Sequence, residues 1–289
     1  MIKTKIKNTA LFLTAVLTLS SCDDIFRDEP MNQISETSIW DNPQLLDEYE
    51  NSWYRGMSNG FSIYVPSNAL LKTASRYYMP WFGDQITVGK SDWFNAGYGD
   101  LLKGNDQELT KWAAYTWSGY FTQIQSINTL LENLNSIPAG SQKTRIEGEA
   151  HFMRAYYYYL LWRMFGGVTI IDHTYNPLEN AERFKRASYD EMVSFIVKEA
   201  DMAANSLPQS YSSTDVGRAT KGAAIMLKAK TYLWASSDIF QDKADSLYYL
   251  GFTNDASQDM LQKAKQAYEE LMALNQYSLI HINATTQDG

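Results

Sequence analysis

Apolar side chains recur at helical spacing over most of the chain after residue 42. Asn42-Pro43 opens a segment with this spacing that continues through Arg55, and proline suits the first turn of a helix because its missing N–H would have no partner there. A longer segment, Leu109 to Leu134, places its apolar side chains largely on one face. Both segments are predicted to be amphipathic helices. Three aromatic residues of the longer one are assigned mainly to the core: Trp112, Tyr115 and Trp117.

Further helices are predicted from the same period together with their end signals. Ser141 is placed to cap one helix, which ends at Gly166-Gly167. Ser188 begins the pattern Ser-Tyr-Asp-Glu, which is typical of a capping box, and the helix that follows ends before Pro208. The last two predicted helices span Ala219 to Ser236 and roughly Ser257 to Leu274.

The helices are predicted to pack as antiparallel pairs, with small Ala and Gly residues where they approach each other. This arrangement is similar to tetratricopeptide-type stacking, although the repeat period is loose. Periodicity is lost between Met57 and Asp106, where Gly, Pro, Asn and Ser are frequent. The predicted fold class is therefore mainly α, with tetratricopeptide-like paired helices (an α-α superhelix) and long irregular loops.

The first 21 residues have the pattern of a secretory signal. Lys3, Lys5 and Lys7 precede a short apolar stretch, which is too short to span a bilayer as a stable anchor. Small residues then lead to Cys22, the only cysteine of the chain. Leu19-Ser20-Ser21-Cys22 is similar to a bacterial lipobox, so Cys22 is the predicted lipidation site. An unpaired thiol without this role would be a liability in an exported protein.

The predicted organisation has three parts. Residues 1–21 form a lipoprotein signal peptide, and residues 22–40 form an acidic tether that includes Asp23, Asp24, Asp28 and Glu29. Residues 41–289 form one helical domain. Since no other segment is long and apolar enough to cross a bilayer, the membrane is expected to be reached through the lipid anchor only.

Composition narrows the classes of partner. Hydrophobic residues make up 45% of the 289-residue chain and charged residues 20%, which is the profile of a globular domain. The formal net charge of −8 argues against nucleic acid as a partner. The aromatic share is 14%, and rigid aromatic side chains suit binding surfaces as well as helix-packed cores.

Three stretches resemble the SusD/RagB family. Arg145 to Val168 looks like the signature E-A-x-F-x-R-A-x-x-Y … F-G-G-V-P, with Thr169 where proline is usual. Gly217 to Ala224 is similar to G-R-x-T-K-G-A-A, and Ala264 to Leu279 resembles a helix that runs into Y-x-L. With the lipobox, these stretches cover nearly the whole chain in the family's order.

The resemblance implies a lipoprotein of the outer membrane of a Bacteroidota-type bacterium, facing the cell surface. It implies binding of a glycan, or of another oligomeric nutrient, without catalysis, and delivery to a SusC-like TonB-dependent transporter. Family members are considerably longer, so the sequence is expected to represent a C-terminally truncated SusD-like domain. The signature residues themselves are interpreted as structural, with Arg154 and Arg218 tying helix ends or carboxylates together.

Sequence signatures of catalysis are scarce. The chain has no G-x-S-x-G, H-E-x-x-H, P-loop or G-x-G-x-x-G pattern, and the expectation is no enzyme, no cofactor and no metal. Glu147 and His151 share a helix face at i,i+4, which makes half of a metal site, but a surface pair is the preferred interpretation. A tetratricopeptide-type adaptor and a surface glycoside hydrolase remain as alternatives, and the hydrolase lacks an identifiable acid and nucleophile.

The loop from Arg76 to Tyr98 is the candidate ligand-binding segment. It combines flat aromatic rings, which pack on the C–H faces of sugars, with polar side chains that bind hydroxyls. The candidate residues are Arg76, Trp81, Asp84, Gln85, Trp93, Phe94 and Asn95. The alternative is that the loop's aromatic residues anchor it onto the helices.

Overall fold

The computed structural model describes residues 39–57, 107–175, 184–212 and 214–279, with the backbone alone for 107–115. The α-helices of these ranges are α3 (Pro43–Tyr54), α5 (Gln107–Glu132), α6 (Ser141–Phe165), α7 (Tyr189–Ser206), α8 (Lys221–Ala235) and α9 (Ser257–Ala273). Short 3₁₀ turns are η4 (Leu134–Ser136), η6 (Asp238–Phe240) and η7 (Asp245–Leu247). The described ranges contain no strand, so the mainly α prediction is confirmed.

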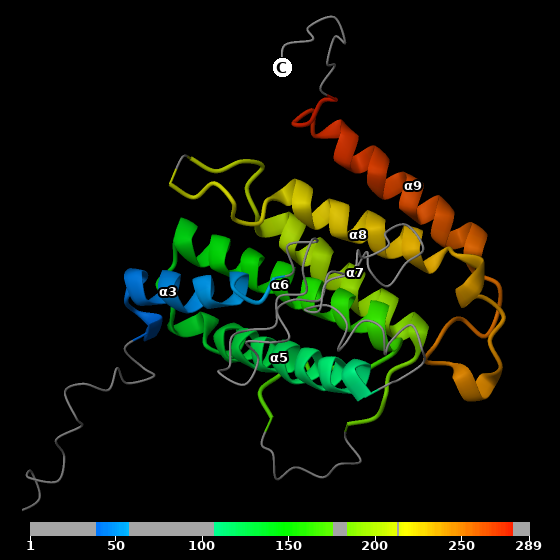
Figure 1. The fold of residues 1–289 in the computed structure, drawn as a ribbon. Coiled ribbons are helices and arrows are strands. Elements are labelled where there is room, and N and C mark those ends of the chain that lie inside the picture. The colour runs from blue at the N-terminus through cyan, green and yellow to red at the C-terminus, as the bar shows by residue number, and fades with distance from the viewer. Residues whose placement is uncertain (1–38, 58–106, 176–183, 213, 280–289) are drawn as a thin grey trace, which may run out of the picture.

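Consecutive helices pack side by side, as Figure 1 shows for α6 to α9. Lys221 N–H, at the start of α8, donates to the carbonyl of Pro208, just beyond the end of α7. Ala187 N–H, just before α7, donates to the carbonyl of Val168, just beyond the end of α6. Helices α7 and α8 thus each begin beside the end of the preceding helix, so α6, α7 and α8 run antiparallel to their neighbours in this series. The prediction of paired helices is confirmed.

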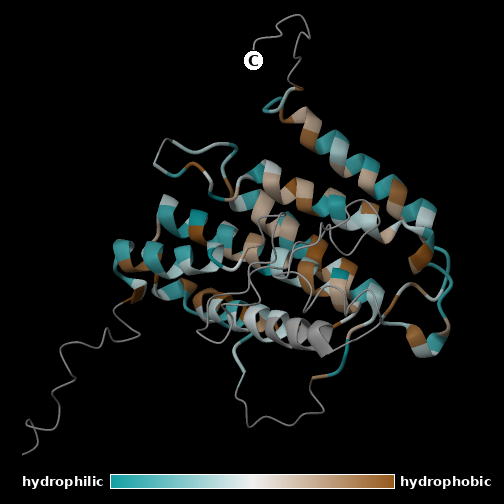
Figure 2. Cartoon of the chain, viewed as in Figure 1, coloured by the Kyte–Doolittle hydropathy of each residue, from teal (hydrophilic) through white to brown (hydrophobic). Residues whose placement is uncertain are grey.

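Helix α6 forms the centre of the core. It contacts α3 and α5 as well as α7 and α8, and most of its residues from Ile146 to Trp162 are buried. A helix that is surrounded by others needs apolar or paired side chains on every face. Its largest buried side chains are Tyr157, Tyr158 and Trp162. Figure 2 shows the same mixture, since apolar and polar residues alternate along the helices rather than forming one apolar block.

The predicted helix ends agree with the structure in most places. Glu191 N–H donates to Ser188 Oγ at 3.1 Å and Ser188 N–H donates to Glu191 Oε2 at 2.7 Å, which confirms the capping box. The predicted cap at Ser141 is wrong. Gly140 already accepts the first helical hydrogen bond, from Thr144 N–H, so Ser141 is the first residue inside α6.

Gly166 and Gly167 end α6 where another part of the chain comes very close. Gly166 has a φ of +69°, which side-chain-bearing residues adopt at a cost. A Cβ atom at Gly166 would collide with the carbonyl oxygen of Tyr249, and one at Gly167 would collide with the carbonyl oxygen of Ala187. The glycine pair therefore lets the segment before α7 and the segment before α9 meet at one end of α6.

Within the described ranges, no helix combines the length and apolar character needed to cross a membrane.

Candidate functional site

An open pocket of about 560 Å³ lies between α5 and the segment that runs from Thr169 toward α7. This volume falls within the range of about 300–1,000 Å³ that small-molecule sites occupy. Residues of α5 form one wall, and residues 169, 171, 175 and 184 form the other. The lining residues are Trp117, Ser118, Phe121, Thr122, Gln125, Thr169, Ile171, Tyr175 and Phe184. We refer to this site as the α5 pocket.

Four aromatic rings dominate the α5 pocket. Trp117 lies 5.0 Å from Phe121 between ring centroids, and it meets Phe165 of α6 edge-on at 5.2 Å. On the opposite wall, Tyr175 and Phe184 meet edge-on at 5.5 Å. Such edge-on and tilted pairs hold aromatic side chains in defined orientations. The pocket therefore presents aromatic surfaces on both walls.

The assignment of Trp117 to the core is wrong, because 40% of this residue is exposed. The buried stripe of α5 passes through Thr116, Tyr120, Ile124 and Ile127. Trp117 follows Thr116 by one position, so the helix rotation carries it off the stripe and into the wall of the pocket. The side chains of Trp112 and Tyr115 lie outside the described residues.

The polar groups of the α5 pocket are hydroxyls and one amide. Thr122 Oγ1 donates to the carbonyl of Ser118 at 2.9 Å, and Thr169 Oγ1 donates to the carbonyl of Phe184 at 3.0 Å. Both hydroxyl oxygens keep lone pairs for a ligand. Gln125 Oε1 is buried without a hydrogen-bond partner in the described part of the chain. None of the described lining residues carries a charge.

A buried hydrogen-bond network fixes the wall opposite α5. Tyr158 OH accepts from Ile171 N–H at 2.6 Å. Asn128 Nδ2 donates to the carbonyls of Ile171 and His173, both at 2.9 Å. Arg154 Nη1 donates to Asn128 Oδ1 at 2.9 Å and to the carbonyl of Asp172 at 3.1 Å. The backbone of residues 171–173 is thus held from α5 and α6 together.

Glu199 of α7 completes this network by accepting hydrogen bonds from Arg154. Arg154 Nε and Nη2 each donate to one Glu199 oxygen at 2.8 Å, a bidentate pair inside the core. Burial opposes ionisation of Glu199, but hydrogen bonds from His151 and Arg154 outweigh it and lower the pKa of this carboxyl. Burial raises the pKa of the Tyr158 phenol, which keeps it neutral and able to donate. Arg154 thus binds one carboxylate, that of Glu199, and ties it to Asn128 and the carbonyl of Asp172, so the prediction that it ties carboxylates together holds only for its binding of a carboxylate.

The interpretation of Glu147 and His151 as a surface pair is wrong. His151 is only 5% exposed, and its Nδ1 lies 2.8 Å from Glu199 Oε2. His151 faces α7. The i,i+4 spacing of Glu147 and His151 does not say which face of the helix the pair occupies, so it could not show that His151 is buried. Within the described residues, no group of three or more His, Cys, Asp or Glu side chains is placed to hold a metal ion.

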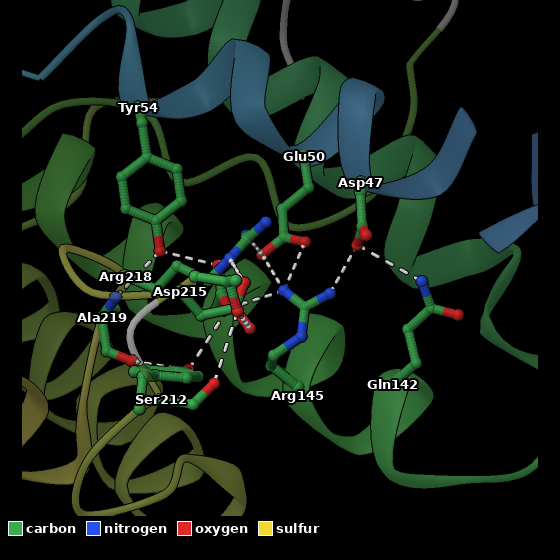
Figure 3. Close-up of polar contacts among 12 residues, drawn as sticks. Asp47, Glu50, Tyr54, Gln142, Arg145, Ser212, Asp215, Arg218 and Ala219 are labelled. Carbon is green, nitrogen blue, oxygen red and sulfur yellow. Dashed lines mark hydrogen bonds and ion pairs between the residues drawn. The ribbon is translucent and has the colours of Figure 1, made fainter. Parts of the chain in front are cut away.

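A second buried network joins α3, α6 and the segment before α8, as Figure 3 shows. Arg145 Nη1 donates to Glu50 Oε2 and to Glu149 Oε1, both at 2.8 Å. Arg218 Nη1 lies 3.1 Å from Glu50 Oε1 and 3.2 Å from Glu149 Oε2. The prediction that Arg218 ties carboxylates together is confirmed. These signature residues hold three elements of the scaffold together.

The residues predicted to contact ligand lie outside the described residues, as does Cys22. These are Arg76, Trp81, Asp84, Gln85, Trp93, Phe94 and Asn95. The α5 pocket was missed by the sequence reasoning, although a signal was present. Trp117, Phe121 and Gln125 recur every four residues, which aligns them on one face of a helix.

The structure defines a helical-repeat fold, in which antiparallel helix pairs position an aromatic pocket on one flank. Comparison with known proteins gives the family. A SusD-like family model, described as "Starch-binding associating with outer membrane", matches residues 27–233. This match covers more than half of the chain, and the chain therefore belongs to the SusD-like family.

Curated relatives agree with this family. A SusD-like protein of Bacteroides ovatus is 25% identical over 230 residues, which cover 76% of this chain and 38% of that protein. SusD-like protein P25 of Formosa agariphila is 28% identical over 235 residues, covering 79% of this chain and 43% of the relative. The chain thus spans less than half the length of these relatives.

Solved structures share the fold. A SusD homologue of Bacteroides thetaiotaomicron superposes with a TM-score of 0.61 at 18% identity, covering 84% of this chain and 43% of that one. A SusD-like protein of Bacteroides fragilis superposes with a TM-score of 0.59 at 24% identity, covering 87% of this chain and 42% of that one. The helical arrangement is accordingly that of SusD-like proteins.

Proposed function

We propose that this protein is a cell-surface lipoprotein that binds glycans and delivers them to a SusC-like TonB-dependent transporter. The observation that carries the proposal is the α5 pocket, whose aromatic walls and hydroxyl groups match the two chemical faces of a sugar. The family description, which names starch binding and association with the outer membrane, supports the same role. The ligand class is glycan, with other oligomeric nutrients such as peptides as the alternative.

The location that we propose is the outer membrane, facing the cell surface. The lipobox that ends at Cys22 and the acidic tether after it support this location. The lipid chain would hold a folded helical domain at the membrane without a spanning helix. A partner transporter in the same membrane would then receive the ligand at short range.

We also propose that the 76–98 loop contributes ligand contacts, with Trp81 and Trp93 as the aromatic platforms. Retention of the protein in affinity gels that contain starch and other neutral polysaccharides tests this. We expect Trp81→Ala and Trp93→Ala to migrate faster in the glycan-containing gel than the wild type, with unchanged circular dichroism spectra. Equal retention of both variants and the wild type would remove the loop from the proposed binding surface.

Two measurements separate this function from the alternatives. Extraction of membranes with mild detergent should co-purify a TonB-dependent porin, whereas a tetratricopeptide-type adaptor would bring down other proteins and bind no glycan. Incubation with a labelled oligosaccharide should return the oligosaccharide intact. Hydrolysis of the label by purified protein would instead support the glycoside hydrolase.

A further inference from the structure

We propose that the α5 pocket binds one uncharged glycosyl unit and that Gln125 is its specificity-determining side chain. This inference rests on the proposed function, since it names the class of sugar that a glycan-binding protein would accept here. It concerns residues of α5 and the facing-wall residues 169, 171, 175 and 184, and none of the residues of the 76–98 loop. The two sets of contacts can therefore be tested separately.

Trp117 is suited to stack on the apolar face of a sugar ring. Phe121 and Phe165 contact its indole at 5.0 and 5.2 Å between centroids, which holds the ring in one orientation, while 40% of the residue stays exposed. A large aromatic residue that is fixed and partly exposed loses little conformational freedom when a ligand covers it. Tyr175 and Phe184 complete the aromatic surface on the facing wall.

Gln125 is placed to bind a sugar hydroxyl. Its Oε1 is buried at the pocket wall and accepts no hydrogen bond in the described part of the chain. An unpaired buried acceptor is unfavourable, because the water it gave up has not been replaced. Rotation of the amide about χ3 breaks no existing bond of this oxygen, and a ligand hydroxyl that donates to it would supply the missing partner. An amide also donates, so it matches the paired donor and acceptor character of sugar hydroxyls.

The electrostatics of the pocket select against charged sugars. No described lining residue is cationic, so a carboxylate or sulfate group would lose its water without gaining a counter-charge. Two groups of polar contacts beside the described residues of the facing wall involve charged side chains. Asp172 Oδ1 lies 3.1 Å from His173 Nδ1, and Arg186 donates to the carbonyls of Phe165 and Gly167. The pocket thus favours a neutral hexose or pentose unit over a uronate.

The wall that faces α5 has a backbone held by hydrogen bonds. The backbone N–H of Ile171 donates to Tyr158 OH at 2.6 Å and its carbonyl accepts from Asn128 Nδ2 at 2.9 Å, so the backbone of this wall is fixed beside the pocket. Since these hydrogen bonds form without ligand, binding does not have to order the wall. Preorganisation of this kind favours one ring size and orientation.

Isothermal titration of the whole chain with matched oligosaccharides tests the inference. The probes are neutral gluco-, manno- and xylo-oligosaccharides and, as charged counterparts, oligogalacturonides of the same length. We expect neutral probes to bind and oligogalacturonides to fail. Trp117→Ala should weaken binding by about tenfold or more through lost stacking, and Gln125→Leu by up to about tenfold through one lost hydrogen bond.

The matched control is Trp234→Ala, which removes a tryptophan of α8 that does not line the α5 pocket. It should leave the affinity unchanged. Trp117→Phe, which keeps an aromatic ring, is the second variant in case alanine disturbs folding, and it should retain more affinity than Trp117→Ala. Thermal melts followed by circular dichroism verify that each variant is folded.

The outcomes separate the two proposals. Unchanged affinity of Trp117→Ala, Trp117→Phe and Gln125→Leu for a glycan that the wild type binds would overturn the pocket as a sugar site and leave the proposed function standing. Binding of oligogalacturonides that is lost in the same variants would overturn the neutral specificity. Failure of the wild type to bind any probe of either kind would overturn the glycan function and this inference together.

Discussion

Glu50 of α3 and Glu149 of α6 share a side-chain hydrogen bond in the interior, and neither is exposed to solvent. Arg145 bridges them with one nitrogen, Nη1, at 2.8 Å from each, and Arg218 approaches both from the other side. Tyr54 OH donates to Glu149 Oε2 at 2.6 Å. Two acidic groups this close favour a state in which they share one proton.

The pKa values of the two carboxyl groups are shifted in opposite directions. Burial, followed by the hydrogen bond and the negative charge of Glu149, raises the pKa of Glu50 from 4.5 to about 9. Burial acts against ionisation of Glu149 as well, but hydrogen bonds from Glu50, Tyr54 and Arg145 outweigh it and lower its pKa. Glu50 is therefore the protonated member of the pair at neutral pH, and it donates to Glu149.

The raised pKa of Glu50 predicts how stability depends on pH. The folded state binds a proton at Glu50 that the unfolded state releases above pH 4.5, so this contribution is complete below 4.5 and is lost as the pH rises toward 9. The free energy of unfolding should therefore fall across this window, by at most about 1.4 kcal/mol per pH unit. Urea unfolding at intervals from pH 5 to pH 9 measures the slope.

The control for this slope is Glu50→Gln, which keeps the size and the hydrogen-bond donor but removes the titration. Its stability should vary less with pH than that of the wild type over the same window. Lys263→Met, which breaks the exposed pair with Asp259, should leave the slope as it is. A Glu50→Gln variant with the full wild-type slope would show that another group binds the proton.

Arg154 predicts a large loss of stability on substitution. Arg154→Met fills much of the same space but leaves the carboxylate of Glu199 without the two 2.8 Å hydrogen bonds from Arg154. Removal of one partner of a buried pair costs about 3–5 kcal/mol, because the remaining charge stays in the interior. Chemical denaturation should show this loss, and the double variant Arg154→Met with Glu199→Leu should recover part of it. A cost below about 1 kcal/mol would contradict the role of Arg154 as the support of this network.

Substitution of Gly166 should lower the stability of the fold for a different reason, namely backbone strain and a steric collision. Gly166→Ala requires a left-handed backbone at a φ of +69° and also drives a Cβ into the carbonyl oxygen of Tyr249. Gly217→Ala is the matched control, because it shares a positive φ, +107°, but its Cβ would meet nothing within 4 Å. Backbone strain costs each variant about 1–3 kcal/mol, and the collision adds to the cost at Gly166 alone. Thermal melts should rank Gly166→Ala below Gly217→Ala, and equal melting temperatures would contradict the close approach.

Sequence reasoning predicted the helices because their signals are local. The capping box at Ser188 and Glu191 and the glycine pair after Phe165 each depend on a few neighbouring residues and on backbone preferences that hold in any fold. The resemblance to the SusD-like family identified the fold as a whole. Arg154 and Arg218 were expected to bind carboxylates, but the sequence could not say which ones, since Glu199 lies 45 positions from Arg154 and Glu149 lies 69 positions from Arg218.

The candidate site was less predictable, because it depends on which helix faces meet. Periodicity assigned Trp117 to the core, since a strongly amphipathic helix does not show where its buried stripe ends. His151 was placed on the surface for the converse reason, as α6 is buried on nearly all sides. The α5 pocket also needs Tyr175 and Phe184, which lie more than 50 residues after Trp117 in the chain. Only the packing of α5 against the segment after α6 brings them together.

The location of the protein in the cell is expected to depend on Cys22. Cys22→Ser removes the thiol that the lipobox would present for acylation, so the folded domain should lose its only expected membrane tether. In fractionated cells we expect the wild type in the outer-membrane pellet with incorporated labelled palmitate. The variant should be unlabelled and recovered in a soluble fraction, with the same circular dichroism spectrum. The matched control is Ser20→Ala, which keeps a small residue before the cysteine and should stay labelled and membrane-bound. Retention of unlabelled Cys22→Ser in the pellet would show that the helical domain itself, or a partner bound to it, provides the attachment.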